Sequence, residues 1–573
     1  ARDIDATVAV TGLGIDPFSP KTKATAKIAL DHVEYMGRNY DDVTLDAIVA
    51  DGHAAIEALS RNRNANFSLK ADGNLSGDTY DWNFDGNIRH IDLRALALSD
   101  TTADGSITLS GNARLRPAVA ATRRTSARPM TIYANVNIAD LYWHMPGDAV
   151  NANDIAIEFN ADTTLTDAAL TNRDLALKFY APVPLDTLTK RFGWAAMVLN
   201  RDMERRRLAI DTLQRALPPF SLNLQAGTDN ILSNYLLGSD ISFQTLHVNA
   251  LNDSLLTLNA YCDGVKSGET KLDTLTLSMK QRNNYMLYEA KMRNRPGTFD
   301  QFASVDAKGY INADRIALIF KQQNLAGETG YSLGAMARVD DKNTIELRFV
   351  PYHPVIGYKD WEINKDNFIR YNLQSQHLDA NLDLHNSVSS VHLFTEHQEN
   401  DSLQEDVILK VKDIKLSDWL ALNPFAPPIT GDLSADMRLS WQKPDLNGNG
   451  TVSLTGFNYG KKKVGDFELA LDVSTNTAGT IRANTSLMVN GVKAITATGN
   501  LNDSTAEHPF LLDFKMIRFP LSVANPFLPQ GTASLSGVLN GEMDITGDMA
   551  NPIFNGFLDF DTTTVNVEML GTP

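Results

Sequence analysis

The sequence predicts a predominantly all-β fold, in which a long antiparallel sheet curls into an elongated apolar groove and one amphipathic helix is inserted. Three observations lead to this prediction. Apolar and polar residues alternate with a period of two along most of the chain, turn-forming dipeptides separate the alternating segments, and one segment has helical periodicity. Alternation places apolar side chains on one face of each strand and polar side chains on the other. This pattern is typical of antiparallel sheets, because strands of parallel sheets have continuous apolar runs.

Length and composition narrow the class of protein. The chain has 573 residues, of which 43% are apolar and 21% are charged, as in globular proteins and unlike disordered ones. Asp and Glu number 69 against 52 Lys and Arg, and the net charge of −17 argues against a general nucleic-acid binder. The single cysteine, Cys262, permits neither an internal disulfide nor a cysteine metal site, and we interpret it as a small buried apolar residue.

The first alternating segments precede residue 185. In Gly105–Leu115 the odd positions are mostly apolar and the even positions are polar, so Ile107, Leu109 and Leu115 are candidates to line the groove. Shorter segments of the same kind are 155–161 and 175–179. The low-complexity stretch 117–129 is predicted to be an exposed loop.

A single amphipathic helix is predicted for residues 185–217. Its apolar positions recur in steps of three and four, and Pro218-Pro219 follows them. We expect this stripe to lie against a sheet with the basic side in solvent, or else to cap the groove or contact anionic lipid. The stripe consists of Leu185, Leu188, Phe192, Ala195, Leu199, Met203, Ile210, Leu213 and Leu217.

Alternation resumes after the helix and continues to the C-terminal end. Segments 220–224, 345–349, 433–441, 467–473 and 535–545 each have one apolar face. The candidate groove-lining residues in this part are Ile345, Leu347, Leu433, Met437, Leu439, Leu535, Leu539, Met543 and Ile545. Turns are predicted at Asp104-Gly105, Asn447-Gly448, Asn490-Gly491 and Asn540-Gly541.

The chain also contains a divergent internal repeat. Ile414-Lys-Leu416-Ser is followed by Asn423-Pro-Phe425, Gly431 and an alternating strand. Phe519-Pro-Leu521-Ser is followed by Asn525-Pro-Phe527, Gly531 and another such strand, and Ile91-Asp-Leu93-Arg before Gly105 is a more divergent copy. A repeat of this kind predicts an array in which each unit covers its neighbour.

Catalytic signatures are weak in this sequence. Gly330–Gly334 matches the G-x-S-x-G pattern, but the residues after it read as a strand, whereas a nucleophile elbow requires a helix there. Asp445–Gly450 resembles half of a calcium loop, but Gly456 stands where the bidentate Glu is needed, and we interpret the segment as a hairpin turn. We therefore predict that the protein is not an enzyme and has no metal site and no cofactor.

The expected length of the apolar face indicates what it could bind. At about 12–14 residues for each strand and turn, the chain accommodates roughly 40 strands, which at about 4.8 Å each extend on the order of 200 Å. Large twisted sheets curl or split. A curled sheet with an apolar concave side is a conduit for apolar ligands.

One segment resembles a known family. Gly537–Gly541, followed by Gly547, Asn551-Pro552 and Gly556, is similar to the glycine-rich hairpin that precedes the C-terminal domain of the TamB family, whose members are AsmA-like, bridge-like lipid transfer proteins. Pro351–Tyr371 is similar to the middle of the same family, though less specifically. The resemblance implies a β-taco divided into groove repeats (1–184), the amphipathic helix (185–219), further groove repeats (220–530) and the start of the C-terminal domain (531–573).

The resemblance also implies a function and partners. It implies a periplasm-spanning bridge of a Gram-negative bacterium that conducts phospholipids between the inner and outer membranes and supports outer-membrane protein assembly and secretion. The implied partners are phospholipids, an outer-membrane Omp85-type barrel (TamA-like) and the inner membrane, through an N-terminal anchor outside this chain. No nucleic acid is among them. Two alternatives stay open: a surface-exposed β-solenoid or adhesin with a structural role, and a carbohydrate-acting enzyme on a β-helix.

Overall fold

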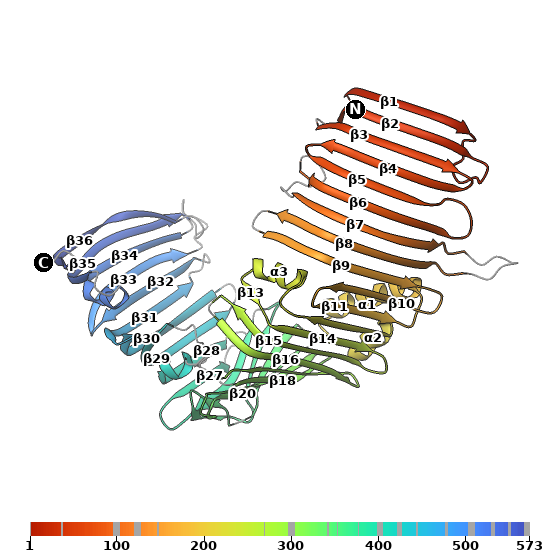
Figure 1. Cartoon of the computed structure of the whole chain (residues 1–573). Coiled ribbons are helices and arrows are strands. Elements are labelled where there is room, and N and C mark those ends of the chain that lie inside the picture. The colour runs from red at the N-terminus through yellow and green to blue at the C-terminus, as the bar shows by residue number, and fades with distance from the viewer. Residues whose placement is uncertain are drawn as a thin grey trace. The chain divides into compact units, whose positions relative to one another are not determined.

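In the residues that it describes, the computed structural model contains an antiparallel sheet of 36 strands and few helices, which confirms the predicted all-β fold (Figure 1). The structure describes residues 2–35, 38–94, 104–119, 128–145, 148–268, 270–295, 304–340, 343–351, 353–375, 377–397, 405–420, 427–442, 445–475, 480–501, 510–528, 533–547 and 552–566. The chain divides into two compact units, here called unit 1 (Ala1–Phe299 and Lys308–Ala313) and unit 2 (Asp300–Ala307 and Asp314–Pro573). Strand β18 (Ser304–Asn312) contains residues of both.

In unit 1 the strands lie side by side in chain order (Figure 1). The exception is β13, which pairs with β15, so that β12 pairs directly with β14. The strands are β1 (Arg2–Leu13), β2 (Lys23–Tyr35), β3 (Arg38–Ala50), β4 (His53–Asn62), β5 (Ala65–Asn74), β6 (Tyr80–Asp92), β7 (Asp104–Arg116), β8 (Thr131–Met145), β9 (Asp148–Ala161), β10 (Thr166–Asn172), β11 (Leu175–Ala181), β12 (Phe220–Ala226), β13 (Ile241–Ser242), β14 (Thr245–Asn252), β15 (Leu256–Ser267), β16 (Thr270–Arg282) and β17 (Tyr285–Arg293).

Unit 2 follows the same plan with one interruption. Strand β21 pairs directly with β25, and the short strands between them pair elsewhere, β22 with β20 and β24 with β26. The strands are β19 (Arg315–Gln323), β20 (Thr329–Val339), β21 (Thr344–Phe349), β22 (Val355–Ile356), β23 (Lys359–Asp360), β24 (Glu362–Ile363), β25 (Phe368–Asn372), β26 (Leu378–His385), β27 (Ser390–His397), β28 (Glu405–Lys415), β29 (Ile429–Gln442), β30 (Asp445–Tyr459), β31 (Lys462–Thr475), β32 (Ile481–Val489), β33 (Val492–Leu501), β34 (Phe510–Pro520), β35 (Ser534–Gly547) and β36 (Pro552–Asn566).

The predicted single helix is two helices. Helix α1 (Leu185–Glu204) and helix α2 (Ile210–Ala216) are separated by a turn in which Arg206 has a positive φ of 53°. The turn is anchored by Asp202, a buried residue whose carboxylate accepts hydrogen bonds from Arg201 and from the N–H of Ala209. The periodic pattern missed this break, because its steps continue in phase across the turn.

The described residues contain three further helical segments, none of which the sequence analysis predicted as an element of the fold. Helix α3 (Ile231–Gly238) follows β12, helix α4 (Leu416–Leu420) follows β28, and the 3₁₀ helix η1 (Leu521–Phe527) follows β34. The last two lie at corresponding positions of the internal repeat. The Asn423-Pro-Phe425 part of the repeat, Gly531 and residues 120–127 of the expected loop lie outside the described residues.

The internal repeat has a specific structural basis. In both copies the first strand has a bulge just before its last pairing, between Val411 and Ile414 in β28 and between Met516 and Phe519 in β34. The bulged residues have positive φ, and each donates its N–H to a side chain of the next long strand. Asp413 donates to Ser434 Oγ over 3.0 Å and Arg518 to Asn540 Oδ1 over 2.8 Å. The bulge therefore directs the chain into the short helix that follows.

Most of the predicted glycine turns are wrong. Asn490-Gly491 does form the turn between β32 and β33, with positive φ at both residues. Asp104-Gly105, Asn447-Gly448 and Asn540-Gly541 instead lie within β7, β30 and β35. Asp445–Gly450 is accordingly strand and not the expected turn, whereas the strand expected after Gly330 is confirmed as β20.

Candidate functional site: the apolar face of the sheet

An unbroken row of apolar side chains crosses unit 1. Residues directly opposite one another in an antiparallel pair lie on the same face, so the strand registers trace that face from strand to strand. One row contains only apolar residues and glycine: Val10, Ala26, Ala47, Ile56, Ala71, Phe84, Gly111, Val136, Ile157, Leu170, Leu177, Leu224, Val248, Ala260, Leu277 and Ala290.

Unit 2 has a corresponding apolar face. From β26 to β36 one row runs through Leu384, Val391, Val411, Ala435, Val452, Leu469, Leu487, Ile495, Met516, Gly541 and Leu558. The neighbouring row contains one polar residue, Thr485, and runs through Leu382, Leu393, Leu409, Met437, Gly450, Leu471, Thr485, Ala497, Phe514, Met543 and Gly556. The apolar face is thus continuous from β1 to β17 in unit 1 and from β26 to β36 in unit 2.

The structure places the predicted groove-lining residues other than Leu535 on these faces. In unit 1, Leu109 lies opposite Gly86 and Ile138, and Ile107 and Leu115 follow the same alternation in β7. In unit 2 the apolar face includes Ile345, Leu347, Leu433, Met437, Leu439, Leu539, Met543 and Ile545. Leu535 lies opposite Val565, beyond a register shift between Ser536 and Val538, so the register does not connect it to the rest.

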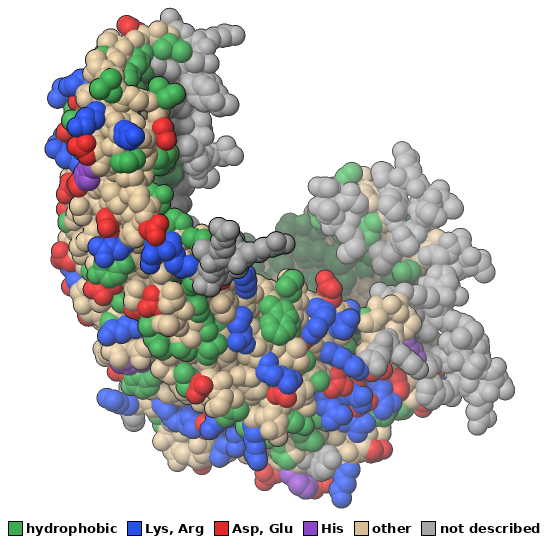
Figure 2. Space-filling view, turned by 90° about the vertical axis from the view of Figure 1, so that its right-hand side faces the viewer, with side chains coloured by type: hydrophobic (Ala, Val, Ile, Leu, Met, Phe, Trp, Pro, Cys, Tyr) green, Lys and Arg blue, Asp and Glu red, His purple; other side chains and the backbone are tan. Residues whose placement is uncertain are grey.

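These side chains are only half-buried. Leu115 is exposed, and the other predicted groove-lining residues are partly buried. Phe554 and Phe560, on the apolar side of β36, are 62% and 58% exposed. Each side chain is covered by its neighbours on the same face, but no second sheet lies over the face within the described residues. Figure 2 shows a recessed surface formed mainly by hydrophobic side chains.

Strand glycines allow large side chains to lie across the apolar face. A Cβ at Gly448 would come within 2.5 Å of Leu439 Cδ2, and one at Gly450 within 2.8 Å of Met437 Cγ. The same holds in unit 1, where a Cβ at Gly111 would come within 2.7 Å of Phe84 Cζ. Glycine inside a strand often marks such a close approach. The glycines that we predicted as turns are therefore positions at which the face accommodates a larger neighbour.

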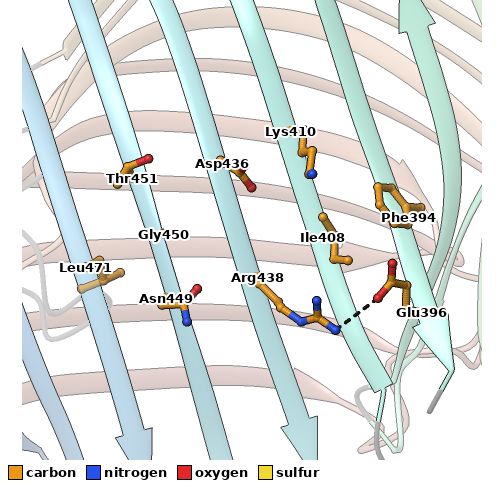
Figure 3. A pocket seen from close by; sticks show the side chains of 10 residues that line it. All are labelled: Phe394, Glu396, Ile408, Lys410, Asp436, Arg438, Asn449, Gly450, Thr451 and Leu471. Atoms are coloured by element: carbon orange, nitrogen blue, oxygen red, sulfur yellow. Dashed lines mark hydrogen bonds and ion pairs between the residues drawn. The ribbon is translucent and has the colours of Figure 1, made fainter. Parts of the chain in front are cut away.

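The opposite face carries charge. In unit 1 it presents ion pairs between neighbouring strands, such as Lys70 Nζ with Glu57 Oε1 at 3.0 Å. In unit 2 Arg438 binds both the buried Asp406 and Glu396, and these hydrogen bonds raise the pKa of the Arg438 guanidinium above its ordinary value. Figure 3 shows Glu396, Lys410, Asp436 and Arg438 around a shallow depression of about 540 Å³ on this face.

Short helices cover the margins of the apolar face. Ile231, Leu232 and Leu236 of α3 pack against Leu170, Leu224 and Leu246, which belong to the apolar face of unit 1. In α1, Phe192 lies 6.0 Å from Phe220, whose ring is stacked on Phe179. In unit 2, α4 places Trp419 beside Leu433, and η1 places Val523 beside Phe467. The helices thus lie where strands end and leave the middle of each face uncovered.

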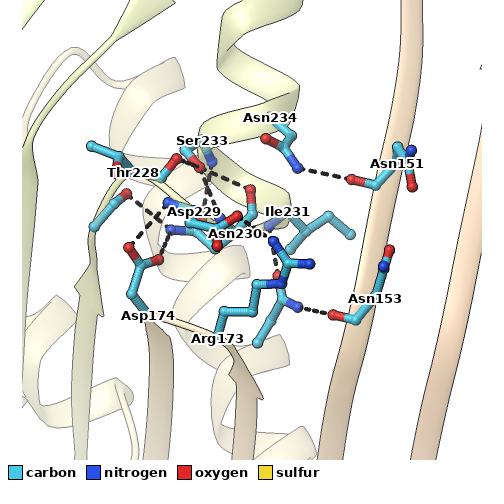
Figure 4. A network of polar contacts seen from close by, with 12 residues as sticks. Asn151, Asn153, Arg173, Asp174, Thr228, Asp229, Asn230, Ile231, Ser233 and Asn234 are labelled. Carbon is cyan, nitrogen blue, oxygen red and sulfur yellow. Dashed lines mark hydrogen bonds and ion pairs between the residues drawn. The ribbon is translucent and has the colours of Figure 1, made fainter.

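A polar network fixes helix α3 to the ends of three strands (Figure 4). Asn230 caps the helix by accepting a hydrogen bond from the N–H of Ser233 at 2.9 Å, and Asn172 Oδ1 accepts from the N–H of Ile231 at 2.7 Å. Burial raises the pKa of Asp174, but hydrogen bonds from the Asn230 side chain and from N–H groups of residues 227–229 outweigh it, so the pKa lies below its ordinary value. Asp174 therefore stays ionised and holds the cap in place.

Burial raises the pKa of the Cys262 thiol, which packs in the cluster beneath α3. Within the described residues no group of three or more His, Cys, Asp and Glu side chains is placed to hold a metal ion. In the same residues no helix is both long enough and apolar enough to cross a membrane.

Sequence reasoning located the apolar face but missed the elements that border it. The capping pair Asn230 and Ser233 was a detectable signal for α3. The short strands β22–β24 carried no alternation long enough to detect. Comparisons of the chain with protein-family models, with curated proteins and with solved structures found no match.

Proposed function

We propose that this chain is a conduit that conducts phospholipids by their acyl chains along the apolar face of its sheet. The observation that carries the proposal is the unbroken row of apolar residues and glycine that crosses β1 to β17. A similar face extends from β26 to β36. Such a face is far longer than one small apolar ligand requires, and it is repetitive, as transport along it demands.

The binding free energies favour movement of a lipid along the apolar face over its retention at one position. Each buried methylene contributes about 0.8 kcal/mol, so acyl chains are held without polar contacts. Because the wall repeats similar Leu, Ile, Val and Phe side chains, adjacent positions bind with similar free energy. A ligand then passes from one position to the next without a deep minimum. The short helices pack at the margins of each face, so acyl chains would bind along its middle.

The resemblance to the TamB family supplies the setting of the proposal. In that setting the chain bridges the periplasm, is anchored in the inner membrane, reaches an outer-membrane Omp85-type (TamA-like) barrel, and supports assembly of outer-membrane proteins. The alternative of a β-solenoid requires parallel coils, whereas every strand register described here is antiparallel.

The proposal is tested by purifying the chain without detergent and extracting bound lipid for quantitative mass spectrometry. We expect several phospholipids per chain, with head groups in the proportions of the membrane of origin, and we expect the chain to speed transfer of a fluorescent phospholipid between vesicles. A chain that purifies free of lipid and leaves the transfer rate unchanged contradicts the proposal.

A further inference from the structure

A second cavity lies on unit 2, apart from the apolar face. It has a volume of about 950 Å³ and is lined by both apolar and polar side chains. Three segments distant in sequence meet around it: residues 353–362, the turn after β26 at residues 385–388, and Lys415 at the end of β28. The volume is within the range of small-molecule sites.

The walls of the cavity are held in place by buried contacts. Trp361 is 3% exposed, donates Nε1–H to the Ile356 carbonyl over 3.2 Å, and meets Trp419 edge-on with ring centroids 6.0 Å apart. The hairpin that carries Tyr358 turns through positive φ at Gly357 and Tyr358, both 62°. Strained backbone of this kind in a non-glycine residue persists where surrounding contacts fix it. The cavity is thus a built feature of the fold.

Charges of both signs line the cavity. Lys359 is paired with Asp418 at 2.5 Å, and His385 Nδ1 lies 3.1 Å from Asp383 Oδ1 while its Nε2 lies 3.9 Å from Glu362 Oε2. Among the described residues, Lys415, His353 and Asp360 have no ion-pair partner within 4 Å, so their polar groups are available to a ligand. A ligand with only one sign of charge would meet repulsion from part of this lining.

We propose that this cavity binds a zwitterion that carries a phosphate ester and a primary amine, the chemistry of a phosphoethanolamine head group. Lys415, His353 and Lys359 supply donors for the phosphate oxygens, and Asp360 and Glu362 supply acceptors for the ammonium. The exposed side chains of Tyr358 and Val388 cover the ethylene carbons between the two charges. Assigning the lipid as the source of this group rests on the proposed function, whereas the recognition chemistry does not.

The strands that border the cavity have an apolar cluster on their other side. In each lining segment a residue that lines the cavity is next in sequence to a buried apolar residue, and these apolar residues belong to a single cluster. Trp361 and Ile363 flank Glu362, Leu384 precedes His385, and Ile414 precedes Lys415. A head group in the cavity therefore lies at the ends of strands whose next residues point into the apolar side. The structure thus combines a wall without head-group selectivity and one selective site at its border.

Ligand-observed NMR titration of the purified chain tests the recognition chemistry. O-phosphoethanolamine is expected to bind at least about tenfold more tightly than glycerol 3-phosphate, which lacks the amine, or ethanolamine, which lacks the phosphate. Equal binding of glycerol 3-phosphate would mean a simple anion site and would overturn the proposal, as would no binding of phosphoethanolamine at all.

Two variants separate the two halves of the site. Lys415→Gln should weaken phosphoethanolamine and glycerol 3-phosphate alike by about tenfold, whereas Glu362→Gln should weaken only the compound with the amine. Lys412→Gln is the matched control, since Lys412 is on the same strand but does not line this cavity. Loss of binding in the control to the same extent would show a general charge effect and contradict the site.

The source of the head group is tested with vesicles. Phosphatidylethanolamine vesicles should compete with phosphoethanolamine more strongly than phosphatidylglycerol vesicles do, and glycerophosphoethanolamine without acyl chains should compete less well than the lipid. Equal competition by the free compound would overturn the lipid assignment. Leu109→Lys, on the apolar face of unit 1, should leave phosphoethanolamine binding unchanged, so failure of this site and failure of the conduit give different results.

Discussion

At the scale of single residues, adjacent positions of one strand have opposite chemistry. In β7, Leu109 lies over Gly86 on the apolar face, while Ser110 lies on the polar face opposite Asp85 and Asn137. The two residues share backbone conformation and sequence neighbourhood, so they differ mainly in the face that they occupy. This makes them a matched pair for testing what each face does.

Leu109→Lys should lower, but not abolish, the amount of phospholipid that copurifies with the chain, because an ammonium within the apolar row must be desolvated or must displace acyl chains. Ser110→Lys should have no effect, since the new charge meets Asp85. Both are measured by lipid mass spectrometry, with circular dichroism as a check on folding. Equal lipid loss in the two variants would contradict a face-specific role.

The ion pairs of Glu346 with Arg348 and Arg370 predict that the stability of the paired strands β21 and β25 depends on pH. Burial raises the pKa of Glu346, but hydrogen bonds from Arg348 and Arg370, each 2.6 Å long, outweigh it, so the pKa lies below its ordinary value of 4.5. As pH falls, Glu346 is therefore protonated at a higher pH in the unfolded chain than in the folded chain. The contribution of ionised Glu346 to the stability of the fold is complete above about pH 4.5. It is lost as pH falls through the pKa that Glu346 has in the folded chain.

Glu346→Gln should accordingly speed hydrogen exchange in residues 344–349 at pH 7, and the ratio of variant to wild-type rates should approach one at the acidic end of the range. Taking the ratio at each pH removes the intrinsic pH dependence of exchange. Glu468→Gln, an exposed change on the polar face of β31, serves as the control. A ratio that stays constant with pH would contradict the assigned ion pairs.

At the scale of elements, short helices border a sheet that is otherwise formed by sequential pairing. Helix α1 buries Leu188, Ala195, Val198 and Asp202, whereas Met197 and Met203 stay exposed. The buried set overlaps the apolar stripe that the sequence suggested but does not coincide with it. The helix packs mainly against α2 and touches the sheet through Phe192.

Ala196→Pro, at an exposed position inside α1, should break that helix at a cost of about 3 kcal/mol, whereas Ala196→Gly should cost about 1 kcal/mol. The expected readout is a loss of circular dichroism at 222 nm in the proline variant only. An unchanged spectrum would show that α1 is not the helix described here.

The bulge of the internal repeat is tested by Ser434→Ala, which removes the acceptor of the Asp413 N–H. The loss should cost about 1 kcal/mol locally and should speed exchange of amides in residues 411–415. Ser453→Ala, on the polar face of the neighbouring strand β30, should leave that exchange unchanged. Asn540→Ala, which removes the acceptor of the Arg518 N–H, should speed exchange of the amides around Arg518 in the same way. Faster exchange in only one of the two repeat copies would contradict a bulge that both copies share.

The period-two pattern was enough to predict the fold class and the apolar face of the strands in which we identified it, such as β7 and β29, because strand geometry converts alternation directly into faces. It did not distinguish a glycine in a turn from a glycine beneath a large neighbour, as at Gly448, because that depends on which side chain lies across the sheet. It also missed the break at Arg206 and the cavity around Trp361. Both arise from contacts between segments that are distant in sequence.

At the scale of the whole molecule, apolar residues are distributed over many strands of each unit. Unit 1 and unit 2 each present an apolar face on one side and charged residues on the other, built from strands that follow one another in sequence. Such a design gives many weak and similar contacts. We therefore expect a single apolar substitution to reduce transport in proportion to its size and position, and we expect no one residue to be indispensable.

Site-specific photocrosslinking in cells tests the central claim most directly. Photoreactive side chains at Leu109, Leu347, Leu439 and Met543 lie on the apolar faces of both units, and matched probes at Ser110, Lys410, Glu468 and Asp544 lie on the polar faces. A conduit predicts that every apolar-face probe captures phospholipid and that no polar-face probe does. Capture at a single apolar position, or equal capture from both faces, would contradict the account.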